Sequence, residues 1–274
     1  MKGFDSVKGK ITLIQILLLC VVLICSVNVY KSHVQKTREE KEINSISEPE
    51  SDITVQETNE PYSQSEPENI PEQGLENQEG DTEAKIKKYK DVYSQNSDMV
   101  GWIRVSDTRI DYPVMHNKQS NAYYLHRNIA KEYSSSGIPF MDYQCRGDGT
   151  DDNTIIYAHN MRNGSMFHDL LKYGDKNFYN THKIIEFDTL KSFNKYEIFA
   201  VIRTKVGSEK EFKYYDFINA KTPAEFDKFI SKCIRLSLYK TNVIPRYGEN
   251  LLTLSTCSYN TDNERFVVFA KKLF

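Results

Sequence analysis

The stretch LLTLSTCSYNTDNERFVVFAKKL, residues 251–273, consists of two apolar runs separated by a polar turn. β-Branched and aromatic residues in both runs favour strands, and the Asn and Asp residues between them favour a turn. An antiparallel hairpin places Cys257, at the end of the first strand, near Arg265, at the start of the second. Alternation puts Thr253, Ser255 and Cys257 together on the more polar face of the first strand. The sequence therefore predicts a thiol and a guanidinium at the same end of one sheet.

The chain before this hairpin also alternates between short β-like runs and turn residues. Six further runs have the length and composition of strands: GWIRV, IDYPVM, GIPFMDY, NTIIYAH, KIIEFDTL and KYEIFAVIRT. Helical spacing of apolar residues occurs at 83–96 and at 222–239, and Ser165 is placed to cap a short helix at 166–173. We therefore predict a mainly β fold with helices. It is a closed β-barrel of about eight strands, with an N-terminal helix and a long helix before the strand that ends at Cys257.

The formal charge of −2 for the 274 residues hides a strong division along the chain. Residues 1–30 carry a net charge of +2 and residues 31–84 carry −11, so +7 remains for residues 85–274. The acidic stretch is rich in Glu, Ser, Asn, Gln and Pro, a composition that buries too little apolar surface to fold. We expect a disordered acidic tether over 31–82 and a catalytic domain over 83–274.

The first apolar run, ITLIQILLLCVVLICSVNVY at 11–30, has the length of a membrane helix. A helix of this length extends about 30 Å, the thickness of the bilayer's hydrocarbon core. Lys2, Lys8 and Lys10 precede it, so the positive-inside rule keeps residues 1–10 in the cytoplasm and exports the rest. A cleaved signal peptide is the alternative, but CSVNVYKSH offers a poor cleavage site. We predict an uncleaved transmembrane signal anchor, and a single-pass cell-membrane protein with an extracellular catalytic domain.

Three cysteines follow the apolar run, and this odd number leaves at least one without an intrachain partner: Cys145, Cys233 and Cys257. Cys233 falls on the apolar face of the helix predicted at 222–239, so we interpret it as a core residue. Neither a CxxC pair nor an HExxH motif occurs, which argues against zinc. The GxSxG, GxxxxGK[ST] and GxGxxG motifs are also absent. The sequence indicates no metal and no organic cofactor.

His159 ends another apolar strand, in NTIIYAHNMRNGS, just before a polar loop. Taken singly, a strand-end Cys, His or Arg usually has a structural role in packing or at a solvated edge. Together they supply what a thiol nucleophile needs, namely a nearby base or acid and a cationic donor for an oxyanion. We predict that Cys257, His159 and Arg265 form one site. The remaining histidines of the domain lie in polar contexts without a comparable setting: His116, His126, His168 and His182.

These residues resemble the sortases, which are cysteine transpeptidases of Gram-positive cell surfaces. The resemblance rests on TLSTC, on the Arg in ERFVVFAKK and on YAHNM upstream, and it runs from about residue 83 to the C-terminus. Several features are similar to class B. They are the amphipathic helix before DMVGWIRVSDTRIDYPVM, the segments NAYYLHRN and SSGIPFMDY, and the long helix at 222–239.

The resemblance implies a role for each residue of the predicted site. Cys257 attacks the carbonyl carbon of a Thr in a C-terminal sorting signal and forms a thioester acyl-enzyme. His159 protonates the leaving amine and helps to deprotonate the incoming one, while Arg265 holds the substrate and stabilises the oxyanion. Class B sortases also line the peptide groove with a Ser two residues before the Cys and with an Asn-x-x-x-Leu pair. The matching positions here are Ser255, Asn121 and Leu125.

The implied partners are surface proteins that carry a sorting signal and an amine of a peptidoglycan precursor or cross-bridge, with membrane contact through 11–30. The basic residues of the domain are scattered and an exported domain rarely meets nucleic acid, so we expect no nucleic-acid partner. An anionic wall polymer or lipid head group fits the positive charge better. Two alternatives stay open: a hydrolytic cysteine peptidase with the same Cys-His-Arg site, and an inactive anchored surface-binding module.

Overall fold

The computed structural model describes residues 26, 37, 73–207, 211–257 and 263–273. The chain divides into two units, Met1–Glu48 and Pro49–Phe274. The strands and helices presented below all belong to the second unit.

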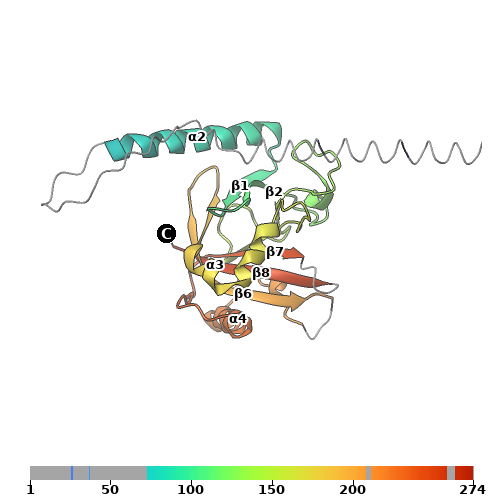
Figure 1. Cartoon of the computed structure of the whole chain (residues 1–274). Helices are drawn as coiled ribbons and strands as arrows, with labels where there is room; N and C mark the ends of the chain where they lie inside the picture. The colour runs from blue at the N-terminus through green and yellow to red at the C-terminus, as the bar shows by residue number, and fades with distance from the viewer. Residues whose placement is uncertain (1–25, 27–36, 38–72, 208–210, 258–262, 274) are drawn as a thin grey trace, which may run out of the picture. The chain divides into compact units, whose positions relative to one another are not determined.

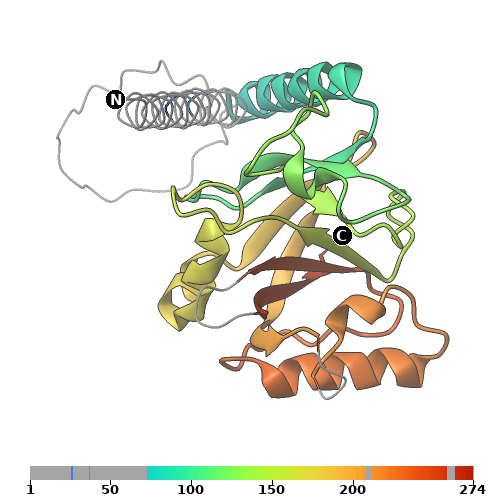
Figure 2. The ribbon, with the colours of Figure 1, turned by 90° about the vertical axis from the view of Figure 1, so that its right-hand side faces the viewer.

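Eight strands among the described residues close into a barrel in the order β1-β2-β3-β4-β7-β8-β6-β5 (Figures 1 and 2). Their bounds are β1 Met99–Arg104, β2 Asp111–His116, β3 Phe140–Met141, β4 Asn153–Tyr157, β5 Ile184–Asp188, β6 Lys195–Lys205, β7 Leu251–Cys257 and β8 Glu264–Lys272. Neighbouring strands are antiparallel except for the pairs β2–β3 and β4–β7, which are parallel. The predicted closed β-barrel of about eight strands is confirmed.

In the ranges that the structure describes from residue 73 onward, three α-helices and three 3₁₀ helices precede or connect the strands. They are α2 Gln73–Gln95, η1 Tyr124–His126, η2 His168–Gly174, α3 Lys176–Thr181, η3 Tyr214–Asp216 and α4 Pro223–Leu236. Helix α2 begins at Gln73 rather than near residue 83, because an established helix gains one backbone hydrogen bond for each residue added. The segment predicted as a helix capped by Ser165 forms η2 instead, and the Ser165 hydroxyl donates to the Asn163 side chain at 2.7 Å.

Helix α2 packs on β1 through one tyrosine. The Tyr89 ring stacks on Trp102 with centroids 5.0 Å apart, and its hydroxyl donates a 2.9 Å hydrogen bond to Asp188 Oδ2. The ammonium of Lys88 lies 4.3 Å from the centre of the same Trp102 ring. The Tyr89 contacts therefore join the helix to both β1 and the end of β5.

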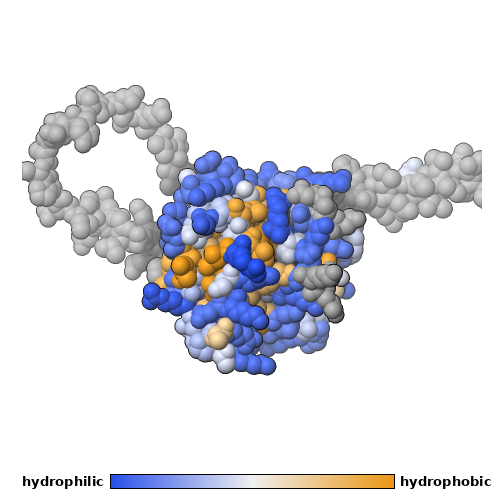
Figure 3. All heavy atoms as spheres, turned by 90° about the horizontal axis from the view of Figure 1, so that it is seen from below, coloured by the Kyte–Doolittle hydropathy of each residue, from blue (hydrophilic) through white to orange (hydrophobic). Residues whose placement is uncertain are grey.

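Helix α4 packs mainly on β6. Thr222 caps it by accepting a hydrogen bond from Glu225 N, and Pro223 occupies its first turn. Its buried face belongs to one cluster with residues of β6, β7 and β8, and four side chains form it: Phe226, Phe229, Ile230 and Cys233. The burial of Cys233 confirms its interpretation as a core residue. Figure 3 views the molecule from below, the side on which α4 lies in Figure 1, and shows apolar surface bordered by hydrophilic side chains.

The polar face of β7 is buried along most of its length. Leu251 belongs to the α4 cluster, and Thr253 and Ser255 follow it on the same face. Thr253 donates to Asn153 Oδ1 at 2.8 Å, and the Ser255 hydroxyl lies 2.6 Å from the Tyr214 hydroxyl. This face reaches solvent only at its end, where Cys257 is partly exposed.

The structure corrects the predicted localisation. Among the residues that it describes, no helix is long and apolar enough to cross a membrane. This finding overturns the prediction of a single-pass cell-membrane protein with an N-terminal anchor. Of the predicted anchor 11–30 only Ser26 is described, and of the predicted tether 31–82 only Thr37 and the part of α2 from Gln73 onward.

Candidate active site

The strands β7 and β8 pair in an antiparallel register that places Cys257 directly opposite Arg265. Residues paired in this way point to the same face, with Cβ atoms about 4.5–5.5 Å apart. Both side chains are partly exposed at this end of the sheet. The predicted hairpin is confirmed, and it brings the thiol and the guanidinium side by side.

The parallel pair β4–β7 brings His159 to the same end of the barrel. Tyr157, the last residue of β4, pairs with Ser255, and His159 therefore follows where β7 reaches Cys257. Asn160 fixes this arrangement, because its side-chain amide donates a 3.1 Å hydrogen bond to the carbonyl oxygen of Cys257. The backbone of Cys257 is thus tied to the residue that follows His159.

One hydrogen bond settles the tautomer of His159. Its Nε2 lies 2.9 Å from the carbonyl oxygen of Leu125, which only accepts hydrogen bonds. Nε2 must therefore carry a hydrogen, and Nδ1 is the nitrogen that is available to exchange a proton. The His126 ring lies beside it, with centroids 5.3 Å apart.

Burial lowers the pKa of His159 below the usual value for histidine, and the proximity of His126 acts in the same direction. The hydrogen bond to Leu125 opposes both effects, because it favours the protonated ring. Burial is the largest of the three causes, so the imidazole is predominantly neutral at pH 7.

The other two described cysteines have very different surroundings. Cys145 is buried, and burial raises its pKa to about 12. Cys233 is 0% exposed, and burial raises its pKa well above the usual value for a thiol. A nucleophilic cysteine reacts as the thiolate and must be reached by the substrate. Of these three cysteines Cys257 alone is partly exposed, so it is the candidate nucleophile. None of the three forms a disulfide.

One cavity of about 610 Å³ collects all six residues predicted for the site. Cys257 lines it from β7, Arg265 from β8, and His159 from the loop just after β4. The three predicted groove residues line it as well: Asn121, Leu125 and Ser255. The structure therefore places the residues of the candidate active site in a single concave space.

Hydrogen bonds hold the predicted groove residues in position. The side-chain amide of Asn121 donates to Asp142 Oδ2 at 2.9 Å, and its oxygen accepts from Tyr143 N at 2.8 Å. The buried carboxylate of Asp142 also accepts a 2.8 Å hydrogen bond from the Tyr157 hydroxyl. Asp142 thus links the Asn121 loop to β4, a role that the sequence analysis did not assign.

Two histidines for which the sequence showed no comparable setting lie next to His159 and Asn160. The His126 ring is tilted by 31° against that of His159. His168 Nδ1 lies 2.8 Å from Asn160 Oδ1, so it donates to that oxygen. The position of Asn160 directly after His159 was the sequence signal that could have indicated its contact with Cys257. Nothing in the sequence indicated a role for His168, because it reaches Asn160 only through the path of the turn at 161–167. Within the described ranges, no group of three or more His, Cys, Asp or Glu residues could hold a metal ion.

Comparison with known proteins identifies the family. The family profile described as "Sortase domain" matches residues 103–273. The chain belongs to the sortase family. It is 39% identical over 176 residues to Sortase B of Listeria monocytogenes, covering 64% of this chain and 69% of that protein.

Solved structures agree with this assignment. The crystal structure of sortase B from Bacillus anthracis in complex with AAEK1 matches with a TM-score of 0.60 and 36% identity, covering 68% of this chain and 84% of that one. The Staphylococcus aureus sortase B–substrate complex matches with a TM-score of 0.63 and 28% identity, covering 73% and 94%. The predicted resemblance is confirmed: this sortase is a class B-like cysteine transpeptidase.

Proposed function

We propose that this sortase cleaves a C-terminal sorting signal after a Thr and joins the new carboxyl end to a cell-wall amine, through a thioester on Cys257. The signal-bearing surface protein is the acyl donor, and an amine of a peptidoglycan precursor or cross-bridge is the acceptor. Asn121, Leu125 and Ser255 line the groove for the signal peptide.

In the first half of the reaction, Cys257 Sγ bonds to the Thr carbonyl carbon while the thiol proton passes to His159. The carbonyl oxygen becomes an oxyanion, which the Arg265 guanidinium stabilises. The carbon–nitrogen bond then breaks, and His159 gives the proton to the leaving nitrogen. The products are a thioester on Cys257 and a peptide with a free amine.

In the second half, an incoming amine attacks the thioester carbon and the oxyanion forms again, while His159 takes a proton from the amine. The carbon–sulfur bond breaks, His159 returns this proton to the Cys257 sulfur, and the new amide leaves. Because the Leu125 carbonyl holds the hydrogen of Nε2, His159 exchanges protons through Nδ1 in both halves.

The direct pairing of Cys257 with Arg265 is the observation that best supports this proposal. A donor for the oxyanion must lie close to the atom that the nucleophile attacks, and the cross-strand pair meets this requirement without any rearrangement of the sheet. The shared cavity adds His159 to the pair.

The test uses the full chain and a library of fluorescence-quenched peptides with one fixed Thr and randomised flanking positions. We expect cleavage after Thr, and we expect added hydroxylamine to appear as a hydroxamate on the Thr carboxyl. Cys257→Ala should abolish both products, whereas Cys145→Ala, a change at a buried thiol outside the cavity, should keep them. Cleavage by Cys257→Ala would refute the thioester, and cleavage without capture of the amine would identify a hydrolytic peptidase instead.

A further inference from the structure

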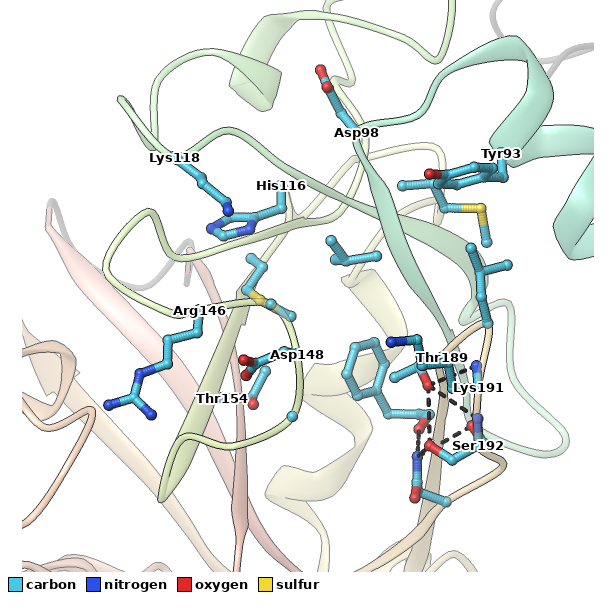
Figure 4. Close-up of a pocket in the computed structure, with 18 of the residues that line it drawn as sticks. Tyr93, Asp98, His116, Lys118, Arg146, Asp148, Thr154, Thr189, Lys191 and Ser192 are labelled. Atoms are coloured by element: carbon cyan, nitrogen blue, oxygen red, sulfur yellow. Dashed lines mark hydrogen bonds between the residues drawn. The ribbon is translucent and has the colours of Figure 1, made fainter.

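A second cavity, also about 610 Å³, opens at the other end of the barrel (Figure 4). Strands β4 and β8 show the relation between the two cavities. Thr154, near the start of β4, lines the second cavity, whereas Tyr157 at the end of β4 lines the first. Lys272, at the end of β8, lines the second, whereas Arg265 lines the first. We call the second space the distal cavity, and none of the proposed catalytic residues lines it.

Basic side chains surround the distal cavity from several elements. Its lining holds four basic residues, Lys118, Arg146, Lys191 and Lys272, and two acidic ones, Asp98 and Asp148. Lys118 follows β2, Arg146 follows β3, Lys191 lies in the β5–β6 turn and Lys272 ends β8. In Figure 4, Lys118 and Arg146 lie on one side of the cavity and Lys191 on the opposite side.

The two acidic residues are already engaged. Asp98 Oδ2 lies 2.9 Å from the ammonium of Lys131 and accepts a 2.6 Å hydrogen bond from the Tyr124 hydroxyl. Asp148 accepts hydrogen bonds from the side chain and the backbone N–H of Thr150, and these lower its pKa.

Three of the four basic residues lack such partners. Arg146 lies 3.7 Å from the carboxylate of Asp151. Within the part of the chain that the structure describes, Lys118, Lys191 and Lys272 form no ion pair. The distal cavity therefore has an uncompensated positive charge that comes from three separate elements.

A buried imidazole forms part of the same wall. His116 is 6% exposed, and its Nε2 has no hydrogen-bond partner. The loop after β3 is seated against this ring, because a Cβ added at Gly147 would lie 2.9 Å from His116 Nδ1. Gly147 also has φ +79°, which favours glycine. The lining of the distal cavity thus includes an unsatisfied polar group two residues before Lys118.

We propose that the distal cavity is a second binding site, and that it takes a ligand with several phosphate groups in series, bound by Lys118, Lys191 and Lys272. A ligand of this kind neutralises charges on different sides of the cavity together. Each ammonium offers three donors, and each phosphate concentrates charge and acceptor oxygens in a small volume. The carboxylates of an acidic polypeptide are carried on a bulkier chain and spaced farther apart than serial phosphates.

Calorimetric titration of the full chain with tripolyphosphate tests this proposal. We expect saturable binding that weakens as salt is raised from 50 to 200 mM. The triple variant Lys118→Gln, Lys191→Gln, Lys272→Gln should bind at least about tenfold more weakly, because charge-assisted hydrogen bonds are lost. It should keep the wild-type melting temperature and peptide cleavage, since no proposed catalytic residue is changed.

The matched control removes the same charge elsewhere, through Lys221→Gln, Lys228→Gln and Lys240→Gln, which are exposed residues in and beside α4. It should bind tripolyphosphate as the wild type does. Absence of saturable binding, or equal weakening in both triple variants, would overturn the proposal. Tighter binding of polyglutamate than of tripolyphosphate would assign the cavity to an acidic polypeptide instead.

Discussion

Replacing Arg265 by lysine keeps the positive charge beside Cys257 but removes the planar fork of donors. In the structure, Arg265 Nη1 donates a 3.1 Å hydrogen bond to the carbonyl oxygen of Glu264. No other hydrogen bond or ion pair of this guanidinium occurs among the described residues. One nitrogen is therefore anchored while the others can reach a substrate oxygen. A lysine ammonium has a single nitrogen, which cannot occupy both places.

The expected loss follows from this geometry. If Arg265 supplies a preorganised donor to the oxyanion, its removal should lower kcat about 10²–10³-fold, or roughly 3–4 kcal/mol of transition-state stabilisation. Arg265→Lys should approach the loss seen in Arg265→Ala, since neither side chain presents the fork. The effect should fall on kcat at least as much as on KM, because the oxyanion exists only after attack.

Steady-state kinetics on a peptide selected from the Thr library would measure both constants for both variants. Arg235→Lys, the same change on the exposed surface of α4, serves as the control and should behave as the wild type. A near-normal kcat in Arg265→Lys would refute the oxyanion role and leave Arg265 as an electrostatic neighbour of the thiol.

Three further predictions concern stability and pH. Cys233→Ala should lower the unfolding free energy by about 1–2 kcal/mol in urea titrations, since the thiol is 0% exposed, with no change in kcat per folded molecule. Tyr89→Phe removes the hydrogen bond to Asp188 but keeps the stacked ring, and should lower the unfolding free energy by about 1–3 kcal/mol. The control Tyr93→Phe, at an exposed position, should lower it by less than about 0.5 kcal/mol. Because burial lowers the pKa of His159, the acid limb of kcat/KM should have its midpoint below about pH 6.5. His126→Gln should move this midpoint upward, since His126 contributes to the lowering, and a downward shift would contradict the electrostatic role given to that ring.

The strands were largely predictable from the sequence, because their short apolar runs and turn residues are local signals. The pairing of Cys257 with Arg265 was predictable for the same reason, as a single turn connects their strands. Helix α2 shows the limit of local patterns. Its apolar stripe indicates where it packs, near Tyr89, but not how far the helix continues beyond that contact toward Gln73.

Contacts between distant segments were not predictable in detail. Asn160 and the Cys257 carbonyl are 97 residues apart in sequence, and His159 and the Leu125 carbonyl are 34 apart. Their contacts depend on the parallel pairing of β4 with β7 and on the path of the η1 loop, which no local pattern encodes. The distal cavity is a similar case, since its lysines are scattered in the sequence and come together only in the folded barrel.

Mass spectrometry of the acid-quenched reaction tests the central claim most directly, because the thioester must exist if Cys257 is the nucleophile. The full chain is mixed with the selected peptide, quenched within one turnover and digested. The account predicts a mass increase equal to the peptide up to and including Thr, carried on the fragment that contains Cys257 and removed by hydroxylamine with formation of the hydroxamate. Turnover without this adduct, or an adduct on Cys145 or Cys233, would contradict it.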